Sequence, residues 1–420
     1  MALYIGIDLG TSGCRACALD ENRQIVHICS RNWPAPLTEK NALEQDARLW
    51  WQEVEQLLSE LCQQIDATQV AAIAVDGTSG TVLVTDEKGE PLAPALMYND
   101  NRAIEQARHI ARHAPENSPA SGAGSGLARL LWLYEHNPVA SHALHQADWV
   151  LGKLSGRFNI SDENNALKTG YDPVKREWPG WINSLGIRHL LPEAIPPGTD
   201  IGCLTDSICQ QFGLARTTRV ISGTTDSIAA FLATGASQPG EAVTSLGSTL
   251  VLKIICEQPV FNADYGIYSH RLGNYWLAGG ASNSGGTVLK QFFTNQQMQD
   301  MTSQLQPEQT TGLDYYPLLK KGERFPQSDP ELQPKLEPRP EQPVVFFQAM
   351  LEGIARIEHK GYQKLHELGT PYPVNIRTAG GGSVNLAWRR IRQDITGVNI
   401  TTADNTEACV GTALLAMQAV

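Results

Sequence analysis

Residues 4–19 read YIGIDLGTSGCRACAL, and this stretch decides how the first half of the chain folds. Apolar residues alternate before the small-residue turn 8–13, and a second apolar run leaves it. The pattern predicts two strands joined by a tight turn, with no helix after it. Glycine-rich turns bind phosphate, because backbone N–H groups approach an anion closely where no side chain intrudes. This turn lacks both GxGxxG and the lysine of GxxxxGK[ST], so we expect the rest of its site elsewhere in the chain.

The composition is that of an ordinary globular protein of more than one domain. The chain has 420 residues, of which 42% are hydrophobic and 18% charged, and its formal net charge is −11. A chain of this length is enough for two domains with large cores. The acidic balance argues against a general nucleic-acid binder, which needs a concentrated basic surface.

Targeting and metal-binding patterns are weak. We expect no signal peptide and no membrane partner, since no charged region precedes a long apolar run and no apolar run is long enough to span a bilayer. A cytoplasmic location is therefore the default expectation. Cys14 and Cys17 form a CxxC, but on a predicted strand their side chains point to opposite faces. A buried free thiol is favoured over a redox pair or a metal site.

The remainder of the chain alternates strands and helices. Short apolar runs up to residue 31 predict an antiparallel meander, and 47–65 has helical spacing with Asp46 as N-cap. The second half begins again with a strand, a turn and a strand. Residues 317–343 are rich in Pro and charge and predict a long irregular connection, followed by a strongly periodic helix that ends at Gly369.

The two halves share a weak internal repeat. Residues 7–19, IDLGTSGCRACAL, and 244–255, TSLGSTLVLKII, both place Leu-Gly and two hydroxyl residues between apolar strands. Two chance turns would explain either one alone, but their paired positions favour a duplication. We therefore expect two similar α/β domains, 1–235 and 236–420, that face each other across a cleft and each present a phosphate-holding hairpin.

Asp8 is the first candidate for chemistry. It ends an apolar strand beside the turn, where an unpaired carboxylate is costly to bury. It could hold Mg²⁺, directly or through water, or orient a polar substrate. The alternative is an Asx-turn residue that caps its own backbone. The preceding apolar run favours the functional interpretation.

Asp226 is the second candidate. It lies in SGTTDSIAAF, 222–231, just inside a predicted helix start. An acid in a first turn is favoured by the helix dipole without any further role. The small residues 223–225 before it would leave room for a ligand, and a carboxylate there could accept a proton from an attacking hydroxyl. The spacing alone favours neither interpretation.

Three further stretches carry weaker signals. TAGGGSVN, 378–385, follows a strand and would let the backbone approach a base or a phosphate, or it is a loop that needs positive φ. GGASNSGG, 279–286, is of the same kind. DGTSG, 76–80, ends another apolar strand and is either a sugar contact through Ser79 or a β-turn.

These pieces, in this order, resemble the FGGY family of carbohydrate kinases, within the actin/hexokinase-like superfamily of RNase H-like domains. The two phosphate motifs resemble 5–20 and 244–252, the adenosine motif resembles 378–385, and the catalytic-base helix resembles 221–236. MYNDNRA, 97–103, is similar to a family Trp-x-Asp-x-Arg pattern with Tyr98 in place of Trp. PLLKKGERFP, 317–326, is similar to a loop of the second domain. The match covers nearly the whole chain.

Within the family, 75–86, 165–173 and 223–236 resemble a compact group of ketopentose kinases associated with D-ribulose. The segment around Asp76 lacks the Gln-Met-His-Gly signature of ordinary xylulose kinases and the Arg-Glu-Thr signature of glycerol kinases. The resemblance therefore implies an ATP-dependent kinase that converts D-ribulose to D-ribulose 5-phosphate. D-xylulose or sedoheptulose as the substrate is the nearest alternative. A non-catalytic, nucleotide-dependent sugar sensor and a phosphohydrolase are more distant ones.

The resemblance also implies a role for each motif residue. Asp226 would be the base and Asp8 would act beside it, and both would lie near Mg²⁺. Two groups of residues would bind the substrates. The sugar would contact Asp8, Thr11, Ser12, Gly13, Arg15, Ser79 and Asp226. ATP would contact Gly10, Thr11, Ser12, Gly247, Ser248, Thr249, Gly381, Gly382 and Asn385. We expect a monomer or a homodimer.

Overall fold

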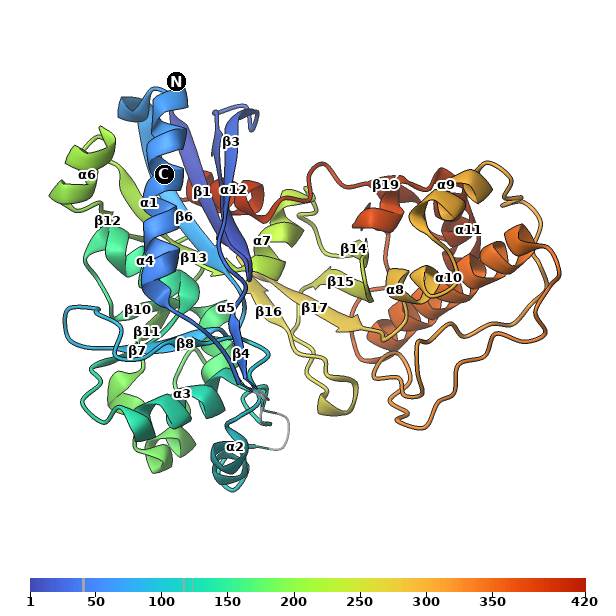
Figure 1. Cartoon of the computed structure of the whole chain (residues 1–420), viewed down its shortest axis with the longest axis horizontal. Coiled ribbons are helices and arrows are strands. Elements are labelled where there is room, and N and C mark those ends of the chain that lie inside the picture. Colours follow the sequence, from blue (N-terminus) through green and yellow to red (C-terminus); the bar gives the residue numbers. More distant parts are fainter. Residues whose placement is uncertain (40–41, 116–117, 123) are drawn as a thin grey trace. The chain divides into compact units, whose positions relative to one another are not determined.

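The computed structural model describes residues 1–39, 42–115, 118–122 and 124–420 (Figure 1). The chain forms two compact units. The first consists of Met1–Ala233 together with Glu407–Val420, and the second of Thr234–Thr406. Our expected division between residues 235 and 236 lies close to the junction of the two units, but the last segment of the chain folds with the first unit.

A mixed sheet in the strand order β12-β13-β6-β1-β2-β3 forms the centre of the first unit. β1 pairs antiparallel with β2 and parallel with β6. β2–β3 is antiparallel, and β13 runs parallel to β6. The predicted meander at the start of the chain is therefore confirmed. The strands are β1 (Leu3–Leu9), β2 (Gly13–Leu19), β3 (Ile25–Asn32), β6 (Val70–Gly77), β12 (Asp200–Cys203) and β13 (Arg219–Thr225).

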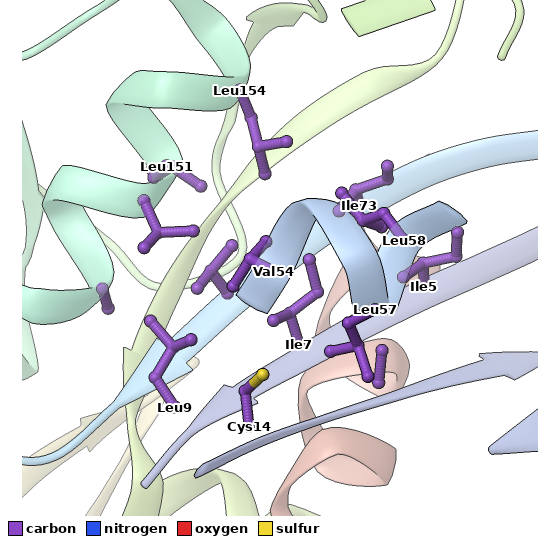
Figure 2. Packing of buried hydrophobic residues seen from close by; sticks show 14 of the residues in the cluster. Ile5, Ile7, Leu9, Cys14, Val54, Leu57, Leu58, Ile73, Leu151 and Leu154 are labelled. Carbon is purple, nitrogen blue, oxygen red and sulfur yellow. The ribbon is translucent and has the colours of Figure 1, made fainter. Parts of the chain in front are cut away.

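The opening stretch is a hairpin because its side chains alternate between two buried faces. Ile5, Ile7 and Leu9 face one side and pack against α1 (Ala47–Gln64) and α4 (Gln146–Ser155), as Figure 2 shows. Gly6 and Asp8 face the other side. The Asp46 side chain accepts a hydrogen bond from the Arg48 backbone N–H, which confirms the predicted cap of α1.

The rest of the first unit surrounds this sheet. A second, antiparallel sheet has the order β4-β5-β8-β7-β9, and β10 pairs with β11. The strands are β4 (Leu37–Glu39), β5 (Ala42–Gln45), β7 (Val82–Thr85), β8 (Ala95–Leu96), β9 (His142–His145), β10 (Ile160–Asp162) and β11 (Glu193–Ile195). The helices are α2 (Ile104–Ile110), α3 (Gly126–His136), α5 (Glu163–Ala166), α6 (Asp206–Phe212), α7 (Asp226–Ala233) and α12 (Ala408–Gln418).

Five strands of the second unit, β17-β15-β14-β18-β19, repeat the order β3-β2-β1-β6-β13 of the first, and the sixth strand lies at opposite edges of the two sheets. The sheet of the second unit runs β16-β17-β15-β14-β18-β19. β14 pairs antiparallel with β15 and parallel with β18, as β1 pairs with β2 and β6. The shared order supports the duplication that the two hairpins indicated. The strands are β14 (Glu241–Leu246), β15 (Leu250–Cys256), β16 (His270–Leu272), β17 (Tyr275–Ala281), β18 (Asn375–Ala379) and β19 (Ile400–Thr402).

The second unit also contains helices and a long irregular connection. Residues 303–342 carry no helix or strand, and all of them are described, so the predicted irregular connection is confirmed. The periodic helix is α10, and Gly369 follows its end with φ 113°. The helices are α8 (Gly286–Lys290), α9 (Asn295–Thr302), α10 (Pro343–Glu367) and α11 (Leu386–Thr396).

The last helix, α12, lies against the face of the first sheet that carries Gly6 and Asp8, and against α7 (Figure 1). Two glycines allow this approach. A Cβ on Gly6 would lie 2.0 Å from the Cys409 carbonyl oxygen, and one on Gly411 would lie 1.8 Å from the Ala229 carbonyl oxygen. The sequence placed 407–420 with the second domain because of its position in the chain. These close contacts place it in the first unit.

The cysteines agree with the sequence interpretation. Cys14 and Cys17 lie on opposite faces of β2 and are buried as free thiols. Among the described residues, no helix combines the length and the apolar character needed to cross a membrane.

We expect Gly6→Ala to destabilise the first unit. The added methyl group would overlap the backbone of α12, and such overpacking costs about 1–3 kcal/mol of unfolding free energy or more. Denaturant unfolding followed by circular dichroism measures the change. Gly180→Ala is the matched control, because a Cβ at Gly180 meets no atom within 4 Å. Equal stabilities of the two variants would contradict the close packing of α12.

Candidate active site

A row of polar residues crosses four neighbouring strands of the first sheet. Asp8 on β1 pairs with Arg15 on β2 and with Asp76 on β6, and Asp76 in turn pairs with Thr224 on β13. Residues directly opposite each other on paired strands share a face of the sheet. The row therefore lies on the same face as Gly6, the face that α12 covers.

Asp8 and Asp76 form a carboxyl pair. Asp76 is fully buried, Asp8 is 9% exposed, and their side chains share a hydrogen bond. Burial raises the pKa of Asp76 well above its usual value, and the Asp8 charge raises it further. Burial also raises the pKa of Asp8, while the hydrogen bond from Asp76 and the charge of Arg15 lower it. Asp76 thus holds the proton that the pair shares, and Asp8 is the more readily ionised member.

Two further groups complete this carboxyl cluster. The Thr412 hydroxyl on α12 donates to Oδ2 of Asp76. Asp226 lies close enough for its charge to contribute to the raised pKa of Asp76. It is half-buried at the start of α7, and its Oδ1 accepts a hydrogen bond from the Ser227 backbone N–H at 2.6 Å. The structure therefore places Asp226 near Asp76, the strand partner of Asp8.

The turn between β1 and β2 uses part of its own backbone. The Gly10 N–H donates to the Gly13 carbonyl oxygen at 2.8 Å, so this amide is already engaged and does not fit the expected phosphate contact. The Thr11 and Ser12 carbonyl oxygens accept hydrogen bonds from the indole and backbone N–H of Trp33. These contacts fix the turn and leave Ser12 exposed.

Gly13 and Arg15 have structural contacts of their own. A Cβ on Gly13 would lie 2.3 Å from the Arg31 carbonyl oxygen, so the close pairing with β3 requires glycine there. The Arg15 guanidinium forms an ion pair with Glu407 at 3.2 Å, with both side chains partly exposed.

Ser79 lies in a turn beside the carboxyl cluster. The Thr78 N–H donates to the Leu9 carbonyl oxygen, and the turn closes from the Thr81 N–H to the Thr78 carbonyl oxygen at 3.3 Å. The segment is thus the β-turn that was one of the two alternatives. The Ser79 Oγ is nonetheless buried and has no hydrogen-bond partner among the described residues. A buried hydroxyl in this state is suited to a ligand.

The segment before Asp226 has a different role from the one we expected. Gly223 and Thr224 are buried in β13 and do not form an open turn. A Cβ on Gly223 would lie 1.6 Å from the Val75 carbonyl oxygen, so glycine is required by the contact with β6. The Asn164 side chain donates to the Thr224 hydroxyl at 3.0 Å. The expected room for a ligand before Asp226 is therefore filled by the sheet.

The second unit contains a cavity of about 770 Å³. Three sequence-predicted segments meet in it. Gly247 and Ser248 come from the β14–β15 turn, Gly286 from the loop 279–286, and Gly381, Gly382 and Asn385 from the loop after β18. Met298, Phe347 and Trp388 supply apolar walls. Thr249, which we expected beside them, does not line this cavity.

Close backbone contacts shape the cavity. The Gly286 N–H donates to the Gly247 carbonyl oxygen at 2.9 Å. A Cβ on Gly382 would lie 2.6 Å from the Trp388 ring, and one on Gly380, with φ 81°, would lie 2.8 Å from the Leu246 carbonyl carbon. A side chain at these positions would force its neighbours to move, so the glycines are required here.

Side chains hold the loops that border the cavity. The buried Glu323 accepts hydrogen bonds from the Ser282 hydroxyl at 2.6 Å and from the Asn283 N–H at 2.8 Å. Asn385 caps α11 by accepting from the Trp388 N–H at 2.8 Å and donates to the Thr302 hydroxyl at 3.1 Å. Its amide is thus engaged at both ends.

Among the described residues, no group of three or more His, Cys, Asp or Glu side chains could hold a metal ion. A smaller donor set fits Mg²⁺, which keeps several waters and binds proteins through one or two carboxylates together with substrate phosphates. Asp8 and Asp226 are the candidate carboxylates for such a site, because each lies near Asp76 and neither is fully buried.

Sequence reasoning singled out the turn after Asp76 but did not select Asp76 or Thr412. The signal for Asp76 was present, because it ends an apolar strand in the same way as Asp8. Two such strands that run parallel place their terminal carboxylates side by side. Thr412 gave no comparable signal, since it lies among small and apolar residues in α12 and belongs to no motif.

Comparisons with known proteins agree with this architecture. Residues 3–233 match the N-terminal domain of the FGGY family of carbohydrate kinases, and 242–420 match its C-terminal domain. The chain therefore belongs to this family. A xylulose kinase of Escherichia coli is 25% identical over 436 residues, which cover 99% of this chain and 89% of the relative. A gluconokinase of Bacillus subtilis is 22% identical over 99% of this chain and 87% of the relative.

Solved structures share the fold. A ligand-bound xylulose kinase from Lactobacillus acidophilus has a TM-score of 0.85 at 21% identity, with 100% of this chain and 89% of that chain covered. A Plasmodium falciparum glycerol kinase with ADP has a TM-score of 0.86 at 18% identity, with 100% and 90% covered. The protein is thus a carbohydrate kinase of two α/β domains, as the sequence predicted.

His145, next to the turn that carries Ser79, generates a prediction about acid stability. The ring is buried, and neither nitrogen has a hydrogen-bond partner among the described residues. Burial, and then the charges of Arg129 and Lys168, lower the pKa of His145 to about 3. Between the unfolded value of 6.5 and this folded value, the unfolded chain binds a proton that the folded chain does not. The contribution of the neutral His145 ring to stability is therefore complete above pH 6.5 and is lost as the pH falls toward 3.

As the pH falls over that range, we expect the unfolding free energy of His145→Leu to decrease less than that of the wild type. The difference should be up to about 1.4 kcal/mol per pH unit. Urea unfolding at a series of pH values measures both proteins. Taking the difference between them removes the contribution of Asp162, whose pKa burial raises to about 6 and which titrates with the opposite sign. Parallel pH profiles for the two proteins would contradict the prediction.

Proposed function

We propose that this kinase transfers a phosphoryl group from ATP to the terminal hydroxyl of a ketopentose, and that D-ribulose is its substrate. The observation that carries the proposal is the cluster of Asp8, Asp76 and Asp226 beside the unpartnered Ser79 hydroxyl. The cavity in the second unit supports the proposal from the side of the nucleotide.

The volume and the lining of the cavity support adenosine as its ligand. Its volume of about 770 Å³ lies within the usual range for small-molecule sites. The backbone at Gly381 and Gly382 would contact a flat base, and Trp388 and Phe347 would contribute apolar surface. Asn385 would act mainly by holding this loop, because its amide is engaged at both ends.

The backbone N–H groups of each hairpin turn are candidates for binding ATP phosphates. In the first turn, Thr11 and Ser12 remain candidates, whereas the Gly10 amide is engaged within the turn. In the second turn, Gly247 and Ser248 line the cavity, and we keep Thr249 as a candidate on the position of the motif alone. Backbone donors of this kind take the place of the P-loop lysine.

Mg²⁺ would be held near Asp8 and Asp226, where it would neutralise phosphate charge. Asp8 is suited to this role because it is the more readily ionised member of the carboxyl pair. The side chain that remains for proton transfer is Asp226.

Asp226 would accept the proton of the terminal sugar hydroxyl as its oxygen attacks the phosphorus. It is half-buried at the first position of α7, where the helix dipole favours the ionised form. The Ser79 hydroxyl would bind a sugar hydroxyl, and Thr11, Ser12, Gly13 and Arg15 would contribute further contacts. Gly13 can act only through its backbone, since β3 packs against its Cα.

D-Ribulose is favoured by the motifs around Asp76, which differ from the signatures of xylulose and glycerol kinases. D-Xylulose is the second candidate, because several relatives along the whole chain are named xylulose kinases. The two sugars differ in the configuration at one carbon. Discrimination therefore depends on a few hydroxyl contacts.

A coupled assay of ADP release tests the proposed function. D-Ribulose, D-xylulose, sedoheptulose, gluconate and glycerol are compared at equal concentration, with a reaction without sugar as the blank. We expect the highest kcat/KM with D-ribulose. A higher value with D-xylulose would replace the substrate but keep the enzyme class. ADP release that is independent of any sugar would overturn the kinase assignment.

Asp226→Asn tests the base. The amide keeps the size of the side chain but cannot accept the proton, so we expect kcat to fall about 10²–10⁴-fold, with ATP affinity unchanged. Calorimetry with an ATP analogue measures the binding, and the coupled assay measures kcat. Asp206→Asn is a matched control, because Asp206 also lies in the first turn of a helix, α6, but is exposed. Full activity of Asp226→Asn would exclude this residue as the base.

A further inference from the structure

We infer that Thr412, on the C-terminal helix α12, is a positioning residue that holds Asp76 and, through it, Asp8. The inference rests on the proposed kinase function, because it concerns how that site is held in place. Neither Thr412 nor Asp76 belongs to the groups that we expect to touch sugar or nucleotide. The contact between Thr412 and Asp76 is on the described part of the chain and lies within the first unit.

Asp76 has few hydrogen-bond partners for a buried carboxyl group. Its carboxyl is completely buried, so each oxygen needs a partner. Oδ2 accepts from the Thr412 hydroxyl, which is itself fully buried. Among the described residues, no hydroxyl or N–H group donates to Oδ1. Thr412 is therefore the donor that fixes the orientation of the carboxyl, and the remaining hydrogen bond of Asp76 is the one that it shares with Asp8.

A close backbone contact with β1 fixes the position of α12. Gly6 lies two residues before Asp8 on β1, and a Cβ there would lie 2.0 Å from the Cys409 carbonyl oxygen and 2.3 Å from the Ala413 nitrogen. Thr412 is therefore carried by a helix whose backbone touches the strand that bears Asp8. The approach leaves Thr412 little freedom to move relative to Asp76.

α12 also contacts both neighbours of Asp8 in the row, Arg15 and Asp76. α12 begins after Glu407, which pairs with Arg15 on β2, and it reaches Asp76 on β6 through Thr412. The five-residue step from Glu407 to Thr412 spans about 7.5 Å along the helix. This length is similar to the separation of β2 and β6, which are two strand spacings, or about 9.5 Å, apart. The helix therefore crosses the sheet over Asp8 and contacts the neighbours of Asp8 on both sides. The buried Thr412 contact is the stronger of the two, because exposed ion pairs contribute little.

The same helix also contacts α7, which begins at the proposed base Asp226. A Cβ on Gly411 would lie 1.8 Å from the Ala229 carbonyl oxygen of α7, the helix that starts at Asp226. Thr412 thus follows directly on the residue that sets the distance between α12 and α7. A shift of Thr412 would reach Asp8 through Asp76 and would not disturb the cavity of the second unit.

The experiment compares Thr412→Val with Thr412→Ser in the full chain. Valine keeps the shape and removes the donor, whereas serine keeps the hydroxyl. We expect kcat for the ketose to fall about 10–100-fold in Thr412→Val, as for other outer partners of a catalytic group, and to recover to within a few-fold in Thr412→Ser. The affinity for an ATP analogue, measured by calorimetry, should be unchanged in both variants.

Thr244→Val is the matched control for stability. Thr244 also donates to a buried carboxylate, that of Glu358, at 2.6 Å, but it lies in the core of the second unit. Its replacement should lower the melting temperature as Thr412→Val does and leave kcat per folded molecule unchanged. Asp76→Asn is a second variant, because the amide still accepts from Thr412 and donates to Asp8. We expect it to keep more activity than Asp76→Ala.

The outcomes separate the two proposals. An active wild type with Thr412→Val at the wild-type kcat overturns the inference and leaves the kinase assignment in place. Equal losses of kcat in Thr412→Val and Thr244→Val also overturn it, since they indicate a general loss of folding. A wild type without sugar-dependent ADP release overturns the proposed function and the inference together.

Discussion

The parallel register of β1 and β6 is the constraint on which the first unit depends. It places Asp8 beside Asp76 at the ends of two buried strands. Two carboxyl groups in such a position need a shared proton and further donors, or the sheet would not be stable. The rest of the unit meets this need. Arg15 lies on one side, Thr412 donates on the other, and the glycines at 6 and 411 let α12 come close enough to do so.

This arrangement explains why the last helix of the chain folds with the first unit. α12 is a helix of small residues with no strongly amphipathic face, so the sequence does not show what it packs against. Its partners are two backbone surfaces, the strand at Gly6 and the helix at Ala229. Such a contact depends on the absence of side chains. It leaves no apolar pattern by which it could be predicted.

The two units share the order of five strands but differ in the residues at the ends of those strands. Both contain a hairpin followed by parallel strands. In the first unit, the ends of the strands carry carboxyl groups, and in the second they carry glycine loops that border a cavity. Glu323 shows how the second unit supports its loops, since one buried carboxylate holds the turn 282–283. The duplicated sheet thus carries a group of carboxyl side chains in one unit and a glycine-bordered cavity in the other.

The sequence by itself determined the two hairpins, the cap of α1, the irregular connection and the long periodic helix after it, and it selected Asp8 and Asp226 as candidates. These follow from alternation, helical spacing and turn residues, which are local properties of the chain. Tertiary structure decided which groups the predicted site residues contact. It showed that Gly13 and Gly223 serve strand contacts, that the Gly10 amide is engaged, and that Thr249 does not line the cavity. It also joined Asp76 to Thr412, residues 336 positions apart. No local pattern encodes that contact, because it depends on how a helix and a sheet pack.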